Sequence, residues 1–524
     1  MNRSVLKNIA GVCVLLIFVQ GAGAEVFLPG MQPKEAGIEF AKVQQCKMCH
    51  SQTPNGPADP FFSWQSGMMS QAMRDPVFRA ALTIANQDVE GVGEFCLRCH
   101  APRGWLEDRS KPGDASALNA EDMYGVSCDV CHRLIDPLSD EARKLVEDVP
   151  PSYGNAMMVA DPDNAVRGPY ADSKGAMPHN TKKSEYHASS SLCATCHNIS
   201  NPLQARDVKT QPVHTFSHIE RTYSEWLLSD FAKLGRDGTC QSCHYKKVEG
   251  GGQASRFGSP KRDYFIQHGP VGGSIWAQEV NWLLWDGQDM DRKAVDMGKQ
   301  RALELLKEAA SLKLTKSGPK EATLRITNLT GHKLPTGYIE GRRMWVNVKF
   351  FDSAGKLLNE IGRYGPQNDT VFGKPVTAAT LLGPEQTRVY ECLPAMSEAQ
   401  AKKFGQKPGK SFHFVLSDVI AKDNRIPPKG FKNSAFEEHL SQPVGATYAD
   451  GQHWDDMPLE LPPGCERIAV NLMYQSVSWE YLKFLAEENR TDDWGKRLYE
   501  AYNQTGQCAP VVIAEIENSP ANLK

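Results

Sequence analysis

Ten cysteines and five histidines of this chain fall into five copies of one motif, Cys-x-x-Cys-His. Two thiols three residues apart share one face of a helical turn, so both can bond to the same porphyrin edge. The histidine that follows is then placed to ligate the iron from the proximal side. Five copies therefore predict five covalently attached c-type haems. The attachment cysteines are Cys46, Cys49, Cys96, Cys99, Cys128, Cys131, Cys193, Cys196, Cys240 and Cys243, and the proximal histidines are His50, His100, His132, His197 and His244.

Paired cysteines also occur in zinc ribbons and in thioredoxin-like dithiols. Neither needs a histidine directly after the second cysteine of every copy, so haem is the favoured interpretation. Cys392, Cys465 and Cys508 lie outside the motifs in the later part of the chain. Two of these three could pair in an oxidising compartment, and the sequence leaves open which two.

The sixth coordination position of each iron decides what the haem can do. A histidine there gives a low-potential electron carrier, a methionine raises the potential, and an open position permits chemistry on a substrate. His332 is the favoured distal ligand because two glycines and a proline fix its turn, Gly331-His332-Lys333-Leu334-Pro335-Thr336-Gly337. The full set of candidate distal ligands is His332, His187, His268, His179, His214, His218 and Met69, and only one or two of His179, His214 and His218 are needed.

The secondary structure expected to position these residues is of the α+β class, with a loop-rich helical part followed by a part rich in strands. Residues 25–314 are rich in loops, as expected where haem supplies much of the apolar core, and include a helix that Asp75 caps and an amphipathic closing helix from about residue 291 to 314. Residues 315–478 contain short runs of β-branched and aromatic residues between turn signals, which predicts an immunoglobulin-like β-sandwich. The expected strands are Ala322–Ile326, Met344–Phe351, Thr387–Cys392, Ser411–Leu416 and Arg467–Tyr474, and residues 479–524 are expected to form a helical segment.

Residues 1–24 have the pattern of a secretory signal peptide, with Arg3 and Lys7, a short apolar run and an Ala-x-Ala site. The chain is therefore expected in the periplasm or outside the cell, with no transmembrane span in the mature protein. Its formal net charge is −3, which argues against a nucleic-acid partner. Redox proteins, soluble or membrane-bound, are the expected partners.

Several segments resemble the multihaem cytochromes c of the cytochrome c-552/4 type. They are Trp64 with the stretch 68–82, Gly125-Val126-Ser127-Cys128, Ser191-Leu192-Cys193 and the turn that carries His332. In that family the histidine of this turn is similar to a distal haem ligand, and a Trp-x-x-Ser-x-His segment often supplies another. Here Gly67 and Met69 stand at the Ser and His positions. The resemblance thus leaves one haem with methionine ligation or with an open site.

Two functions follow from these alternatives. The first is an exported pentahaem cytochrome that carries electrons in a respiratory chain, and the ligand count favours it. The second is a multihaem oxidoreductase acting on a small nitrogen or sulfur compound at one haem with an open position. A binding role for the β-domain is compatible with the first. The sequence does not decide whether the protein is an enzyme, although an electron carrier is favoured.

Overall fold

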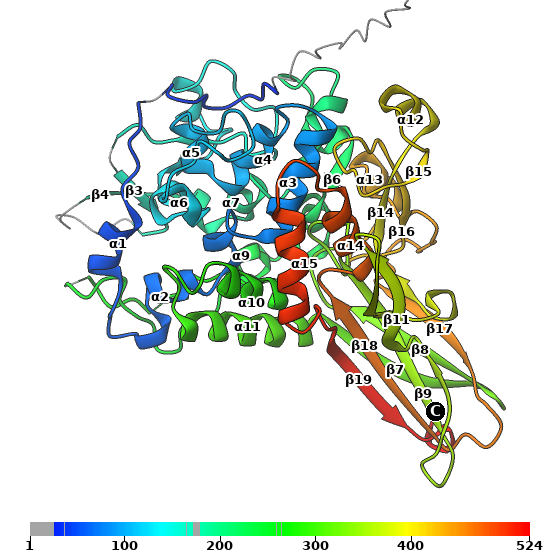
Figure 1. Ribbon diagram of the computed structural model, residues 1–524. Coiled ribbons are helices and arrows are strands. Elements are labelled where there is room, and N and C mark those ends of the chain that lie inside the picture. Colours follow the sequence, from blue (N-terminus) through cyan, green and yellow to red (C-terminus); the bar gives the residue numbers. More distant parts are fainter. Residues whose placement is uncertain are drawn as a thin grey trace, which may run out of the picture.

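The structure is a computed structural model that describes residues 26–523 except 36, 164, 171–178, 258 and 264. The expected signal peptide, residues 1–24, lies outside the described residues. The fold is α+β, as predicted: short helices and loops form the first part of the chain, and the strands gather in the last part (Figure 1). In the described part of the chain, the helices are all too short or too polar to cross a bilayer.

The first part of the chain, residues 26–309, is called the haem region below. Its helices are α1 (Val43–His50), α2 (Pro60–Gln65), α3 (Pro76–Asp88), α4 (Gly93–His100), α5 (Pro102–Leu106), α6 (Cys128–Arg133), α7 (Ser190–Ala194), α8 (Thr222–Leu227), α9 (Cys240–His244), α10 (Ile275–Leu284) and α11 (Arg292–Lys307). Its strands form three two-stranded pairs: β1 (Leu134–Ile135) with β2 (Val159–Ala160), β3 (Ala165–Gly168) with β4 (Asn180–Lys183), and β5 (Ile199–Ser200) with β6 (His218–Glu220).

Each attachment motif begins on a short helix, as the spacing of its two cysteines requires. The helices α1, α4, α6 and α9 contain the whole motif, and each ends at or just after the histidine. The fourth motif differs, because α7 ends at Ala194 and the remaining residues form a turn. In that turn the His197 amide still donates to the Cys193 carbonyl at 2.9 Å, so the helical spacing is kept.

The helix before the second motif forms as predicted. The Asp75 side chain caps α3 by accepting from the Val77 amide at 2.9 Å, and Pro76 occupies the first turn. The closing helix is shorter than predicted, because α11 ends at Lys307 and residues 310–318 form a strand. There Leu314 is buried opposite Leu324, which is the period-two pattern of a sheet.

Two antiparallel sheets pack face to face to form the predicted sandwich. One sheet has the order β17-β8-β7, and the other has the order β10-β9-β18-β19, with β13 also paired to β9. Their facing side chains, including Leu324, Val348, Met457 and Val470, share one hydrophobic core. The strands are β7 (Ala310–Gly318), β8 (Glu321–Asn328), β9 (Arg343–Phe351), β10 (Leu357–Ile361), β13 (Val389–Tyr390), β17 (Trp454–Glu460), β18 (Arg467–Gln475) and β19 (Val511–Asn518).

Smaller elements lie beside the sandwich. They are the hairpin β11 (Tyr364–Val371) and β12 (Lys374–Leu381), a sheet of β15 (Gly409–Lys410), β14 (Cys392–Met396) and β16 (Val419–Asp423), and the helices α12 (Glu398–Phe404) and α13 (Asn433–Glu438). The strand predicted at Ser411–Leu416 is wrong. That segment is a turn, in which the Leu416 amide donates to the His413 carbonyl at 2.9 Å and Val415 packs with α12 rather than in a sheet.

The C-terminal segment is only partly helical. The helices α14 (Trp479–Glu488) and α15 (Trp494–Gln504) were predicted, but the helical assignment of residues 479–524 fails at Val511–Asn518. This stretch forms β19 along β18, since its alternating apolar residues place Ile513 in the sandwich core. α14 and α15 pack against α3 through Leu482, Leu498 and Ala80, so they join the sandwich to the haem region (Figure 1).

Candidate functional site

The histidines of the five motifs, which are the predicted proximal ligands and are called proximal histidines below, each have a hydrogen bond at the Nδ1 atom of the ring. Such a bond fixes the tautomer and leaves Nε2 free to ligate iron. Four of the partners are backbone carbonyl oxygens: Ala254 for His50 at 2.6 Å, Ala72 for His100 at 3.0 Å, Arg167 for His132 at 2.6 Å and Val271 for His244 at 2.6 Å. For His197 the partner is the Glu220 carboxylate at 3.1 Å.

Three proximal histidines have a second histidine ring at almost the same distance. The ring centroids of His50 and His179 are 6.3 Å apart, those of His132 and His268 are 6.2 Å apart, and those of His244 and His332 are 6.3 Å apart. The interplanar angles of the three pairs are 19°, 31° and 30°. Sequence separations of 88 to 136 residues show that the fold, and not local structure, brings these rings together.

This spacing fits a metal held between two imidazoles. Metal–nitrogen bonds of about 2 Å on both sides, with about 1.1 Å from each nitrogen to its ring centre, separate the centroids by about 6.2 Å. The donor atoms also fit, because His332 uses Nδ1 on the Lys333 carbonyl at 3.0 Å and keeps Nε2 free. The residues present therefore suit haem with two histidine ligands at three of the five motifs.

The other four predicted distal candidates have different surroundings. His187 lies 5.8 Å from His132, but its Nδ1 bonds the Ser184 hydroxyl at 2.9 Å and its Nε2 bonds the Cys131 carbonyl at 3.0 Å, so neither nitrogen is free. His214 stacks on His439 at 4.0 Å. His218 is close to the charged side chains of Arg221 and Arg425, and its buried Nε2 has no hydrogen-bond partner.

Met69 lies in the 3₁₀ turn η2 (Met68–Gln71), where its carbonyl accepts from the Val126 amide at 3.0 Å. It thereby supports the lead-in to the third motif. Met73, one helical turn further on, is fully buried and packs in one cluster with Cys96 and Phe78. Met73 thus lies at the second motif, where Phe78 also stacks on the face of His100 with ring centroids 3.5 Å apart.

His100 and His197 differ from the other proximal histidines. Within the part of the chain that the structure describes, no histidine ring faces either one at the spacing of the three pairs. His197 is further set apart by its carboxylate partner. Burial lowers the pKa of the other proximal rings, to about 4 for His100 and His244, whereas for His197 the Glu220 carboxylate outweighs burial and raises the pKa to about 9.

A buried ion-pair cluster supports the turn that carries His332. Lys333 Nζ lies 2.6 Å from Asp423 Oδ2, and Arg425 contacts the same carboxylate at 2.7 Å and Glu225 Oε1 at 3.0 Å. Glu225 also accepts from the Lys333 amide at 3.2 Å and from the Thr336 hydroxyl at 2.8 Å. Because Glu225 belongs to α8 of the haem region, the cluster ties the sandwich loop to the haem region at the residue next to His332.

A second set of polar side chains lies along the loop that follows His332. Arg342 donates to the Thr336 carbonyl at 2.6 Å and stacks on Tyr338, with its centre 4.6 Å from the ring. Its charge acts on Glu220, Glu340 and Asp75. Burial raises the pKa of Glu340 to about 7 and that of Asp75 to about 6, so both carboxyl groups can hold a proton near neutral pH.

The attachment motifs adjoin one another. Cys46 lies beside Cys128, Cys196 beside Cys99, and Cys193 beside Cys240, close enough for each thiol to act on the other. Cys196 is also near enough to Cys131 for its charge to raise the pKa of that thiol, in addition to the larger effect of burial. The third and fourth motifs therefore stand between the first and the remaining two.

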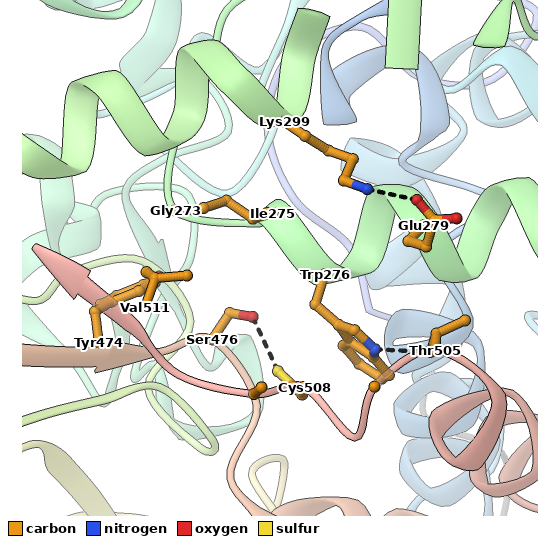
Figure 2. A pocket seen from close by; sticks show the side chains of 12 residues that line it. Gly273, Ile275, Trp276, Glu279, Lys299, Tyr474, Ser476, Thr505, Cys508 and Val511 are labelled. Atoms are coloured by element: carbon orange, nitrogen blue, oxygen red, sulfur yellow. Dashed lines mark hydrogen bonds and ion pairs between the residues drawn. The ribbon is translucent and has the colours of Figure 1, made fainter. Parts of the chain in front are cut away.

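The cavity in Figure 2 lies away from these histidines. It has a volume of about 240 Å³ and is lined by residues of α10, α11, β18, β19 and the turn between α15 and β19, among them Trp276, Tyr474 and Cys508. Lys299 and Glu279 form an ion pair of 2.5 Å at its edge. No proximal or distal histidine candidate lines it, so it belongs to the packing of the haem region on the sandwich.

Sequence reasoning missed the residues that surround the histidines. Glu220, Glu225, Arg342 and Glu340 belong to no motif, and they reach the site only because α8, β6 and the loop after His332 meet there. Residues 45–133, which include the first three motifs, match the family described as cytochrome c554 and c-prime.

A solved structure, a penta-heme cytochrome c552 from Thermochromatium tepidum, is 16% identical to the chain and covers 93% of this chain and 100% of its own, with a TM-score of 0.49. No curated protein matches the chain. The attachment motifs on their helices and the family match identify the chain as a multihaem c-type cytochrome.

Proposed function

We propose that the protein is an exported pentahaem c-type cytochrome that carries electrons in a respiratory chain. The adjacency of the attachment cysteines carries this proposal, because motifs that adjoin in an unbroken series would hold five haems close together. Bound haem would supply one-electron redox chemistry. The signal-like sequence of residues 1–24 supports export to the periplasm or beyond.

The residues of this chain would hold the haems as follows. The five cysteine pairs would attach them, and His50, His100, His132, His197 and His244 would be the proximal ligands. His179, His268 and His332 would be distal ligands opposite His50, His132 and His244. Of the remaining candidates, His187 has both ring nitrogens bonded, so it would position Cys131 and not ligate iron.

Stopped-flow oxidation of the fully reduced protein tests electron carrying. Mixing with more than five equivalents of oxidised cytochrome c, a one-electron acceptor, should withdraw electrons from all five haems in one coupled process. A fraction of haem that stays reduced while the acceptor remains oxidised would contradict an unbroken series.

A second function is favoured by one observation. The loop after His332 brings Arg342, Tyr338 and Glu340 towards Glu220, and hence towards the two proximal histidines without a histidine opposite. The Arg342 cation and the Glu340 carboxyl group, whose pKa burial raises to about 7, could supply charge stabilisation and a proton to a bound substrate. The chain would then act on a small nitrogen or sulfur compound at an open haem.

The spin state of the oxidised protein decides between the two functions. A high-spin haem that binds nitrite, hydroxylamine or sulfite would support the oxidoreductase. If all five haems are low-spin and six-coordinate, the second function has no site.

We also propose a division into a haem domain ending near residue 309 and a sandwich domain that includes α14, α15 and β19. The sandwich would place His332 and could also contact a redox partner, soluble or membrane-bound. A haem domain without the sandwich that binds such a partner unchanged would contradict the contact.

A further inference from the structure

The Glu220 side chain is the one charged group that bonds a proximal histidine in the described part of the chain. The imidazole N–H of His197 therefore has a negatively charged acceptor, whereas those of the other four proximal histidines have neutral carbonyl acceptors. At 3.1 Å the Glu220–His197 bond is longer than the four carbonyl bonds, so its effect rests on the charge of the acceptor and not on a short distance. A carboxylate draws the N–H proton away from the ring more strongly than a neutral carbonyl does. The ring then donates more electron density through Nε2, which favours the oxidised state of the metal it ligates.

Glu220 is fixed in this position from several sides. It ends β6 and is 8% exposed, and the Thr222 hydroxyl donates to its Oε1 at 3.1 Å. Its neighbour Arg221 is fully buried and donates to the Ile199 carbonyl at 2.8 Å and the Phe216 carbonyl at 2.7 Å. These bonds anchor the backbone on both sides of the strand, so the carboxylate has little freedom to leave His197.

The same support reaches the loop that carries His332. The Thr222 hydroxyl lies 3.0 Å from the Thr336 hydroxyl, and Thr336 donates to Glu225, which also accepts from the Lys333 amide. The position of Glu220 therefore depends on the sandwich loop as well as on the haem region. Such a shell of hydrogen bonds around a ligand is what tunes the redox behaviour of a metal site.

We propose that Glu220 is a positioning residue that gives the haem at the fourth motif the lowest reduction potential of the set. This rests on the proposed haem ligation by His197. Electrons on this haem would pass to its neighbours of higher potential, so the centre at the junction of the motifs would be an uphill step for electrons that cross the series from either side. No atom transfer is involved, only the one-electron reduction of each haem by its neighbour.

Spectroelectrochemical titration of the whole protein and of E220Q tests this. The substitution keeps size and a hydrogen-bond acceptor but removes the charge. One midpoint potential, the lowest, should rise by at least a tenfold change in its redox equilibrium, about 59 mV for one electron. The other four should change less. E185Q is the matched control, because Glu185 is 62% exposed and bonds Lys183 and not a histidine, and it should leave all five potentials unchanged.

Two further measurements distinguish a failure of the proposed function from a failure of the inference about Glu220. Haem counts by pyridine haemochrome and protein mass come first: fewer than five haems in the unmodified protein would overturn the proposed function itself. Five haems with unchanged potentials in E220Q, or a uniform shift of all five, would overturn the inference alone. If E220Q incorporates fewer haems, the fraction of E220Q that carries all five haems is separated and titrated, and an unchanged lowest potential in that fraction would refute the role.

Discussion

Loss of the Asp423 charge should destabilise the fold more than any surface charge change in the sandwich. Lys333 and Asp423 are 0% and 1% exposed, and Arg425 and Glu225 complete the cluster at 2% and 0%. Two cations then balance two carboxylates. In D423N the same two cations face one carboxylate away from water, and breaking a buried pair costs about 3–5 kcal/mol.

The matched control is D456N in the same sandwich. Asp456 bonds Arg325 at 2.8 Å, but the two side chains are 39% and 45% exposed, so their loss should cost less than about 1 kcal/mol. Guanidinium unfolding of the haem-loaded proteins, followed by tryptophan fluorescence and Soret absorption, measures both. A D423N protein as stable as D456N would refute the reasoning.

The contribution of Asp423 to the free energy of unfolding depends on pH with a definite sign. Burial raises the pKa of Asp423, but Arg425 and Lys333 outweigh it and hold the pKa below its ordinary value. A carboxyl group with a lowered folded-state pKa stabilises the fold above its unfolded pKa of about 4 and loses that contribution as the pH falls towards the folded value. Between about pH 4 and pH 2 the unmodified protein should therefore lose stability more steeply than D423N.

The remaining predictions concern ligands. H332A should convert about one fifth of the haem to the high-spin form, and added imidazole should restore it, as seen in absorption spectra; an unchanged spectrum would exclude the ligand role. H268A should do the same at the third motif, since its ring stands 6.2 Å from His132, whereas H187A should leave the spin state unchanged because both its ring nitrogens already have partners. Conversion in H187A and none in H268A would reverse this assignment.

Local features of the chain were predictable from sequence. The cysteine spacing determined the helical turns of the motifs, and Asp75 with Pro76 marked the start of α3. Short runs of β-branched and aromatic residues marked β8, β9 and β18 within the sandwich. β19 escaped prediction because its partner β18 lies some forty residues earlier, beyond two helices, and a short apolar run does not distinguish strand from helix without that partner.

The surroundings of the histidines were not predictable in the same way. His332 stood out by its turn of glycines and proline, but its partner His244 follows only from the docking of the sandwich on α8 through Glu225 and Arg425. Glu220 carries no sequence signal, because a carboxylate at the end of a short strand is ordinary until the fold places it beside His197. Long-range contacts, and not residue type, decide which side chain faces which ring.

Near-infrared magnetic circular dichroism of the oxidised protein is the most direct test, because this spectrum distinguishes haems with two histidine ligands from those with histidine and methionine or with an open position. The pairs His50–His179, His132–His268 and His244–His332 predict three haems with two histidine ligands among five. Fewer than three such haems, or more than three, would contradict the account.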